Sequence, residues 1–279
     1  MPTKLSRFTQ RVVSLAQKAV VGDPKPAYRS GEGGYADWVI VALHGLREYL
    51  DQPYRRLLDI LHEMPRIVEI LGLKLDTLPD FSTLCARKQE LKMPVWRVLL
   101  RLSAELHDLG EIQAIDATGF DRVAASQHYA KRTNYTFKAV KTTALIDCKT
   151  GSILDIHCSM KQPADARIGW QVLERNLDRL TKVAADKAYD WWLLRQKLRA
   201  EGVEPVIKHR EFGWDGVANN VLLDDTTYHQ RSNVESTFFA LRQRFGDTLR
   251  ARTWFGQFRE VVLKAAVRNI ELALSPSNP

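Results

Sequence analysis

The chain has 279 residues, 45% of them apolar and 27% charged, with a formal net charge of +8 and a pI near 9.4. This composition is typical of a folded protein with a sizeable core, and no apolar run approaches the ~20 residues needed to cross a bilayer. Because the N-terminus lacks the continuous apolar run of a secretory signal, we expect a cytoplasmic protein. The positive charge favours an anionic partner without identifying it.

Residues 1–34 are predicted to form a basic arm followed by a flexible connection. The first 22 residues carry four Lys or Arg side chains and no Asp or Glu. Pro24, Pro26 and a cluster of glycines that ends at Gly34 then indicate a loop. Order is expected to resume near Tyr35.

Residues 35–108 are predicted to be all-helical. Apolar residues at three- and four-residue intervals indicate helices over 37–50, 53–62 and 65–72, and two more over 83–91 and 94–107. The helix over 83–91 carries Arg87 and Lys88. Short helices with a basic last member are compatible with a helix-turn-helix DNA-binding region, in which these two residues would contact DNA. A small helical bundle without a role in DNA binding is the alternative.

From Glu111 the pattern changes to that of a mixed α/β domain over 109–274, followed by a polar tail at 275–279. Residues 112–116 indicate a buried strand that ends on Asp116, and 135–147 with 152–159 indicate a hairpin. Helices are expected over 165–180 and 191–200. Residues 182–185 and 205–208 indicate two further strands, the first of which ends at Asp186.

Asp116 and Asp186 each follow an apolar strand. The ends of strands in open α/β sheets are where functional sites gather. For either residue alone, an ordinary aspartate that caps a turn is the simpler interpretation.

A third acidic position lies in the pattern Tyr228-x2-Arg231-x3-Glu235-x6-Arg242. On a regular helix these residues fall at about 0°, −60°, −20° and −40°, so that they share one polar stripe. A simple surface ion pair between Arg231 and Glu235 would also explain the spacing. Three converging acids would instead meet the need of phosphodiester cleavage for divalent metal ions, which prefer oxygen ligands.

Further residues have weaker signals. Trp214 lies in a loop-like segment, Phe212 to Gly216, and is a candidate for stacking on an unpaired DNA base. Asp190 is interpreted as a local cap or a salt-bridge partner and not as a metal ligand. The cations near the C-terminus indicate either a phosphate-binding track or a solvated helix face: Arg250, Arg252, Arg259, Lys264 and Arg268.

Three segments resemble the catalytic segments of prokaryotic insertion-sequence DDE transposases, in particular those of insertion-sequence family five. They are Ile115-Asp116-Ala117-Thr118-Gly119, the segment Ala185-Asp186-Lys187-Ala188-Tyr189-Asp190, and the Tyr/Arg/Glu/Arg stripe. Arg242 stands where that family has a lysine. Leu78 to Leu84 also resembles a segment of the helical region of these proteins, so the resemblance covers roughly residues 35–272.

The resemblance implies a ribonuclease H-like catalytic domain in which Asp116, Asp186 and Glu235 hold two divalent ions, Mg²⁺ or Mn²⁺. Tyr228 and Arg231 would contact DNA near the cleavage site. The implied function is a transposase that binds terminal inverted repeats, cuts double-stranded DNA and joins it to a target, as a homodimer when two ends are paired. It would be associated with the nucleoid when bound to DNA. A metal-dependent nuclease without strand transfer and an inactive, domesticated DNA-binding protein are the alternatives.

Overall fold

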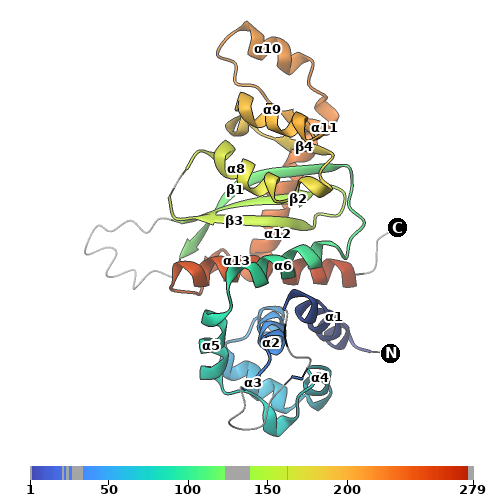
Figure 1. Ribbon diagram of the computed structural model, residues 1–279, viewed down its shortest axis with the longest axis vertical. Coiled ribbons are helices and arrows are strands. Elements are labelled where there is room, and N and C mark those ends of the chain that lie inside the picture. Colours follow the sequence, from blue (N-terminus) through green and yellow to red (C-terminus); the bar gives the residue numbers. More distant parts are fainter. Residues whose placement is uncertain are drawn as a thin grey trace, which may run out of the picture. The chain divides into compact units, whose positions relative to one another are not determined.

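The computed structural model describes residues 2–20, 22, 25–26, 34–122, 139–161 and 163–275, which form two compact units (Figure 1). The helical unit contains the described residues up to Leu106 and those from Val262 onward, and the sheet unit runs from His107 to Val261. The sequence places residues up to 274 in the α/β domain. The later part of the last helix belongs instead to the helical unit, where Asn269 donates a hydrogen bond of 3.1 Å to Ser103.

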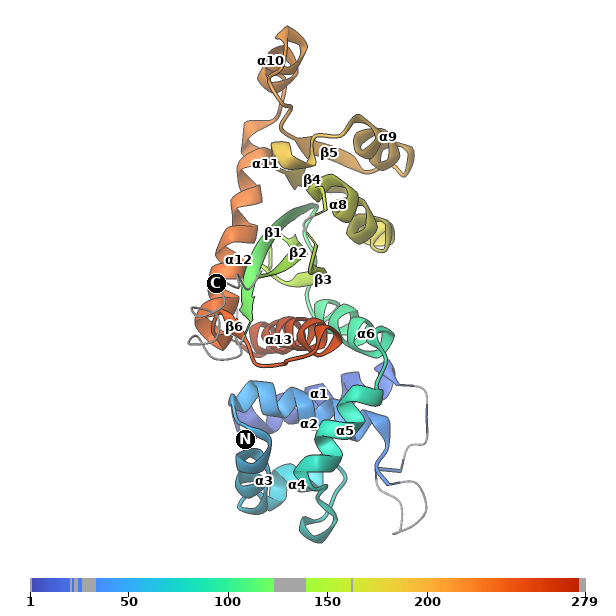
Figure 2. The same ribbon diagram turned by 90° about the vertical axis from the view of Figure 1, so that its left-hand side faces the viewer.

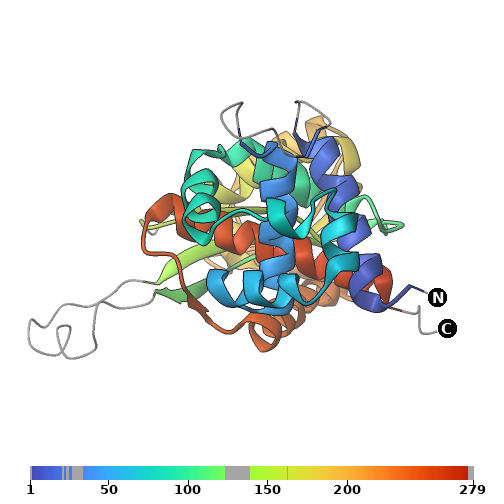
Figure 3. The same cartoon turned by 90° about the horizontal axis from the view of Figure 1, so that it is seen from below.

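The helices of the first unit follow the predicted order, and Figure 3 shows those before residue 90 in blue to cyan and the last helix of the chain in red. They are α1 (Lys4–Ala19), α2 (Asp37–Leu50), α3 (Tyr54–His62), α4 (Pro65–Ile70), η1 (Leu75–Thr77), α5 (Phe81–Glu90), α6 (Met93–Ala104) and the later part of α13 (Trp254–Leu274). The five helices predicted between residues 37 and 107 are therefore confirmed to within a few residues at their ends. Most of the expected connection over 22–34 and of the tail after 275 lies outside the described residues.

The predicted basic arm is a helix over most of its length. Phe8, Val12 and Ala16 of α1 are fully buried, because they recur every four residues and form one apolar stripe. This stripe packs on α2 so closely that a Cβ atom on Gly45 would lie 2.6 Å from Val12 Cγ2. The basic charges of the segment led the sequence analysis to overlook this stripe.

The sheet unit is built on five strands in the order β3-β2-β1-β4-β5. β1 (Ile112–Arg122), β2 (Val140–Asp147) and β3 (Ile153–Ser159) are antiparallel neighbours, whereas β4 (Lys182–Ala185) and β5 (Glu204–Ile207) run parallel to β1. A short sixth strand, β6 (Thr248–Leu249), pairs with the end of β1. This mixed sheet confirms the predicted α/β class. The start of the predicted strand over 135–147 lies outside the described residues.

Helices cover both faces of this sheet. The remaining elements are α8 (Asp165–Glu174), η2 (Leu177–Arg179), η3 (Lys187–Tyr189), α9 (Trp192–Ala200), α10 (Trp214–Val221), α11 (Asp225–His229), η4 (Gln230–Ser232) and α12 (Asn233–Phe245). Figure 2 shows α12 on one face of β1 and β2 and α8 on the other. α12 buries Val234, Phe238 and Leu241, the apolar face that its sequence spacing predicts.

In the described ranges, no helix has the length and the apolar composition needed to span a membrane.

Tyr189 joins the core to the segment that follows β4. Its side chain is fully buried, and Gly169 of α8 lies so close that a Cβ atom there would stand 2.8 Å from the ring carbons Cδ1 and Cε1. Because that separation is below any ordinary carbon contact, a larger residue at 169 would displace Tyr189. The glycine therefore sets how closely α8 approaches η3.

We predict that Gly169→Ser lowers the free energy of unfolding by about 1–3 kcal/mol, the usual cost of overpacking a core. Gly213→Ser is the matched control, because Gly213 has open space around its Cα and extended backbone, and its change should stay within ~0.5 kcal/mol. Urea unfolding of both variants measures the difference. Equal midpoints for Gly169→Ser and the wild type would contradict the close packing.

Candidate active site

Asp116 lies in β1, two residues beyond the point where the pairing with β4 ends. The parallel pairing of β4 with β1 ends at Ala114 and Ala184, while β1 continues and pairs Asp116 with Ala144 of β2. The prediction that the strand ends on Asp116 is therefore wrong, because β2 pairs with β1 as far as Phe120 and β6 pairs with the last two residues of β1. The carboxylate still lies at an edge, because among the described residues no strand other than β2 pairs with β1 between Ala114 and Asp121, where the pairing with β6 begins.

Asp186 directly follows β4, as predicted, and begins the short 3-10 helix η3. Its Oδ1 accepts a hydrogen bond of 2.7 Å from the Ala188 N–H, just as Asp116 Oδ1 accepts one of 2.7 Å from the Ala117 N–H. Both carboxylates are half-buried. Since β1 and β4 are neighbouring strands, the two acids lie at the same sheet edge.

Tyr228, Arg231 and Glu235 come from three successive helical segments and not from one regular helix. Tyr228 belongs to α11, Arg231 to the 3-10 turn η4 and Glu235 to α12. The calculation of a single stripe assumes 100° per residue throughout, which the 3-10 turn violates. The side chains nevertheless meet, because the Arg231 guanidinium lies 5.6 Å from the Tyr228 ring centre and 3.2 Å from Glu235 Oε1.

The loop between β2 and β3 fixes the position of the 3-10 turn. The Cys148 thiol contacts the Gln230 carbonyl at 3.5 Å, and the Asn233 side chain donates to the Cys148 carbonyl at 3.3 Å. These bonds join η4 and the start of α12 to the same sheet that carries Asp116. Glu235 is therefore placed by an anchored turn.

Electrostatics connects the three acids. The pKa of Asp116 is raised to about 6, mainly by burial and also by the negative charges of Asp186 and Glu235, against the lowering effects of the Ala117 N–H and the Arg231 cation. A carboxyl group in this position holds its proton more tightly than an exposed aspartate. The structure thus brings Asp116, Asp186, Glu235 and Arg231 within electrostatic reach of one another.

The acids do not form a closed ligand cage. Within the part of the chain that the structure describes, no three His, Cys, Asp or Glu side chains stand close enough together to hold a metal ion. Glu235 forms an ion pair with Arg231, and its side chain is 62% exposed. Such an exposed ion pair contributes little to stability. Glu235 can therefore leave Arg231 for another partner at a small cost in free energy.

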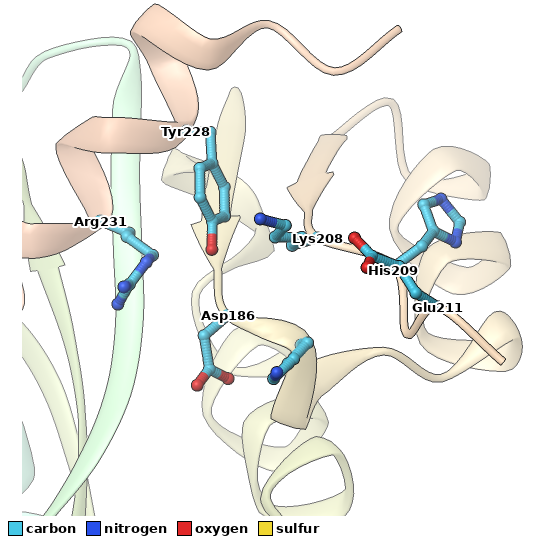
Figure 4. A pocket seen from close by; sticks show the side chains of 7 residues that line it. Asp186, Lys208, His209, Glu211, Tyr228 and Arg231 are labelled. Atoms are coloured by element: carbon cyan, nitrogen blue, oxygen red, sulfur yellow. The ribbon is translucent and has the colours of Figure 1, made fainter. Parts of the chain in front are cut away.

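A cavity of about 340 Å³ opens beside Asp186 (Figure 4). Figure 4 shows the Tyr228 ring between Arg231 and Lys208, with its hydroxyl group directed towards Asp186. The other residues that line the cavity are Lys187, His209 and Glu211. The sequence analysis did not identify Lys208, although a lysine directly after the last residue of β5 is a detectable signal at this sheet edge.

The Asp190 carboxylate fixes the backbone next to His209, one of the residues that line this cavity. It accepts a hydrogen bond of 2.8 Å from Arg195 and one of 2.7 Å from the Arg210 N–H. The prediction that Asp190 is a salt-bridge partner is confirmed.

Arg242 is held against β1. Its guanidinium donates to Thr118 Oγ1 and to the Gly119 carbonyl, the latter at 2.8 Å, and it stands 5.5 Å from the Phe120 ring centre. The three contacted residues follow Asp116 in the strand. Arg242 therefore joins α12 to the part of β1 beyond the site.

Trp214 does not lie in a loop. It is the first residue of α10, and its side chain is 88% exposed. Phe212 beside it is also exposed, and it lines a second cavity of about 560 Å³ that includes Asp186. Trp214 lines neither of these two cavities.

The other predicted DNA contacts lie in the helical unit. Arg87 of α5 is paired with Asp37 at 2.5 Å and with Glu90 at 3.1 Å. Lys88 is buried, with its ammonium 5.9 Å from the Trp96 ring centre, so its position does not favour a surface contact with DNA. Lys264 of the expected C-terminal track is also buried, which argues against a continuous solvated row of cations.

Comparisons with known proteins identify the family of the chain. The family model described as "Transposase DDE domain" matches residues 108–270. Among solved structures, the chain is similar to the piggyBac transposase synaptic complex with hairpin DNA, with a TM-score of 0.48 and 11% identity over 98% of this chain and 75% of that one. It is also similar to the Mos1 transposase paired-end complex with the left transposon end, with a TM-score of 0.24 and 10% identity over 81% and 83%.

Both TM-scores are below 0.5, so the family assignment rests on the family model alone. That model covers the sheet unit from its second residue, together with most of α13, and it includes Asp116, Asp186 and Glu235. Because the match spans more than half of the 279 residues, the chain belongs to the family of transposases with a DDE domain.

Proposed function

We propose that the chain is a DNA transposase of the insertion-sequence type, similar to family five, that binds the terminal inverted repeats of its element and cuts and joins double-stranded DNA. The observation that carries this proposal is the electrostatic coupling of Asp116 to Asp186, Glu235 and Arg231 at one sheet edge. Three acids beside a cation and a tyrosine match the needs of phosphodiester chemistry better than those of a structural ion pair.

Asp116 and Asp186 fit a divalent cation by the chemistry of their donors. Both present carboxylate oxygens, the ligands that Mg²⁺ and Mn²⁺ prefer. Their mutual repulsion raises the pKa of Asp116, and Arg231 is the nearby cation that lowers it. Glu235 would complete the set by leaving its exposed pair with Arg231. When bound, two such ions activate the attacking oxygen and stabilise the leaving oxygen.

The neighbouring side chains supply the rest of the proposed site. Released from Glu235, the Arg231 guanidinium can donate to the oxygens of a DNA phosphate, for which its planar fork is suited. The Tyr228 hydroxyl, directed towards Asp186, can donate to the same strand. We propose that Arg242 contacts the DNA backbone through those guanidinium N–H groups that do not bond to β1. We further propose that Trp214 stacks on an unpaired DNA base.

The helical unit is proposed to bind the inverted repeats, with Arg87 as a candidate contact. A homodimer is proposed for the stage at which two ends are paired.

The products formed from one labelled substrate distinguish the alternative functions. With Mg²⁺, duplex element ends and a target plasmid, joined product supports transposition, cleavage alone supports a nuclease, and binding alone supports an inactive DNA-binding protein.

We predict that Asp116→Asn, Asp186→Asn and Glu235→Gln each reduce cleavage by at least about 10³-fold and leave binding to the ends nearly unchanged. Loss of one metal ligand removes several kcal/mol of transition-state stabilisation, and about 4 kcal/mol corresponds to that factor. Cleavage of a labelled end and its retention in a gel measure the two properties.

Asp121→Asn is the control for these variants. Asp121 is exposed in the same strand, five residues beyond Asp116, and therefore on the opposite face of the sheet. Its variant should cut like the wild type. A variant of Asp116, Asp186 or Glu235 that cuts at the wild-type rate would remove that residue from the proposed metal site.

In the absence of metal, Asp116→Asn should stabilise the protein near neutral pH. The folded pKa of Asp116 is about 6, above its ordinary value of 3.8, so the folded state binds more protons than the unfolded state between these values. Wild-type stability therefore falls as the pH rises through this window, whereas the asparagine variant has no such loss.

Urea unfolding with a chelator present tests this expectation. The two proteins should differ least near pH 4, and the variant should gain progressively towards pH 7. A difference that does not change with pH would show that Asp116 titrates like an exposed aspartate.

A further inference from the structure

Lys208 is a half-buried cation in the cavity beside Asp186. It follows β5, and its backbone N–H bonds to the Ala185 carbonyl at 3.4 Å, next to Asp186 in sequence. Across the described ranges of the chain, the Lys208 ammonium forms no ion pair. It lies 5.9 Å from the centre of the Tyr228 ring. That distance is at the limit of a cation–π interaction.

Within the described part of the chain, the acids that line the same cavity form no ion pair with Lys208. Glu211 accepts a hydrogen bond of 3.0 Å from the Asn220 side chain, and Asp186 accepts one from the Ala188 N–H. The other cation beside the tyrosine ring, Arg231, already has Glu235 as its partner. Lys208 is thus a partly desolvated charge without a counter-ion, which favours the entry of an anion.

The backbone around Lys208 is fixed on its C-terminal side. The His209 N–H donates to the Asn220 side chain at 2.7 Å, and the Asn220 side chain donates back to the His209 carbonyl at 3.0 Å. The Arg210 N–H is held by Asp190. With β5 before it and these bonds after it, Lys208 has little freedom beyond its own side chain, as required of a positioning group.

We propose that Lys208 is a positioning residue that binds a backbone phosphate of the DNA strand passing through this cavity beside Asp186. This inference rests on the proposed function. Figure 4 shows Lys208 and Arg231 on the two sides of the Tyr228 ring, so a strand across the ring meets both cations. The Lys208 contact fixes the register of that strand relative to Asp186, and Arg231 and Tyr228 contact the adjoining backbone.

The test compares Lys208→Gln, Lys208→Arg and Lys161→Gln in the full chain, with a duplex element end as the probe. Lys161 is an exposed lysine after β3, outside the cavity, and its variant removes the same charge. Affinity is measured over a series of salt concentrations, with a chelator present, and cleavage is measured with Mg²⁺.

We expect Lys208→Gln to weaken binding about ten- to hundredfold and to make the slope of log K against log salt less negative by about one, the effect of one lost phosphate contact. Lys208→Arg should retain the slope, and Lys161→Gln should behave like the wild type. An unchanged slope for Lys208→Gln, or an equal change for Lys161→Gln, would overturn the assignment. Wild-type protein that binds the end but does not cut would count against the proposed function and leave the salt test of Lys208 intact.

Discussion

The partial burial of the Asp116 carboxylate beside Asp186 and Glu235 is the constraint on which the candidate site depends. β1 needs β2 to continue past Asp116, yet β4 stops two residues earlier, which leaves the Asp116 carboxylate half-buried at an edge that Asp186 shares. Folding alone would favour a neutral side chain there, and the raised pKa of Asp116 measures that conflict. Retaining an acid at a place where folding disfavours its charge is typical of a functional site.

The surrounding packing keeps this arrangement in place. Tyr189, buried against Gly169 of α8, holds η3 on the sheet, and the negative charges of Asp116 and Asp186 raise its pKa beyond the effect of burial. On the other face, α12 is bound to β1 through Arg242 and a row of apolar side chains. The cations divide into two kinds. Arg231 already has an acidic partner that it can exchange, whereas Lys208 has a ring contact and an open cavity.

Elements whose packing is local could be predicted from the sequence. The helices between residues 37 and 107 have periodic apolar faces, and β4 ends directly before Asp186, as its pattern indicates. The predicted end of β1 and the predicted domain boundary differ from the structure, because both depend on contacts between residues far apart in the sequence. β2 extends β1 past Asp116, and the closing turns of α13 join the helical unit because of contacts far apart in sequence.

The candidate site shows the same division. Glu235 and Arg231 are four residues apart, and their contact followed from spacing, whereas the 3-10 turn that breaks the helix depends on Cys148 of a distant loop. Lys88 carries a charge typical of a surface residue but lies against Trp96. Lys208 could not be linked to Tyr228 from the sequence, because α10 intervenes between them.

Binding of Mn²⁺ to the full chain near pH 6, with the released protons counted, tests the shared carboxylate site most directly. With a pKa of about 6, Asp116 is about half protonated there, so binding through its carboxylate should release roughly half a proton per chain, and much less near pH 8. Asp116→Asn should lose both the binding and the proton release. Tight binding of Mn²⁺ that releases no protons at pH 6, or that persists unchanged in Asp116→Asn, would contradict the account.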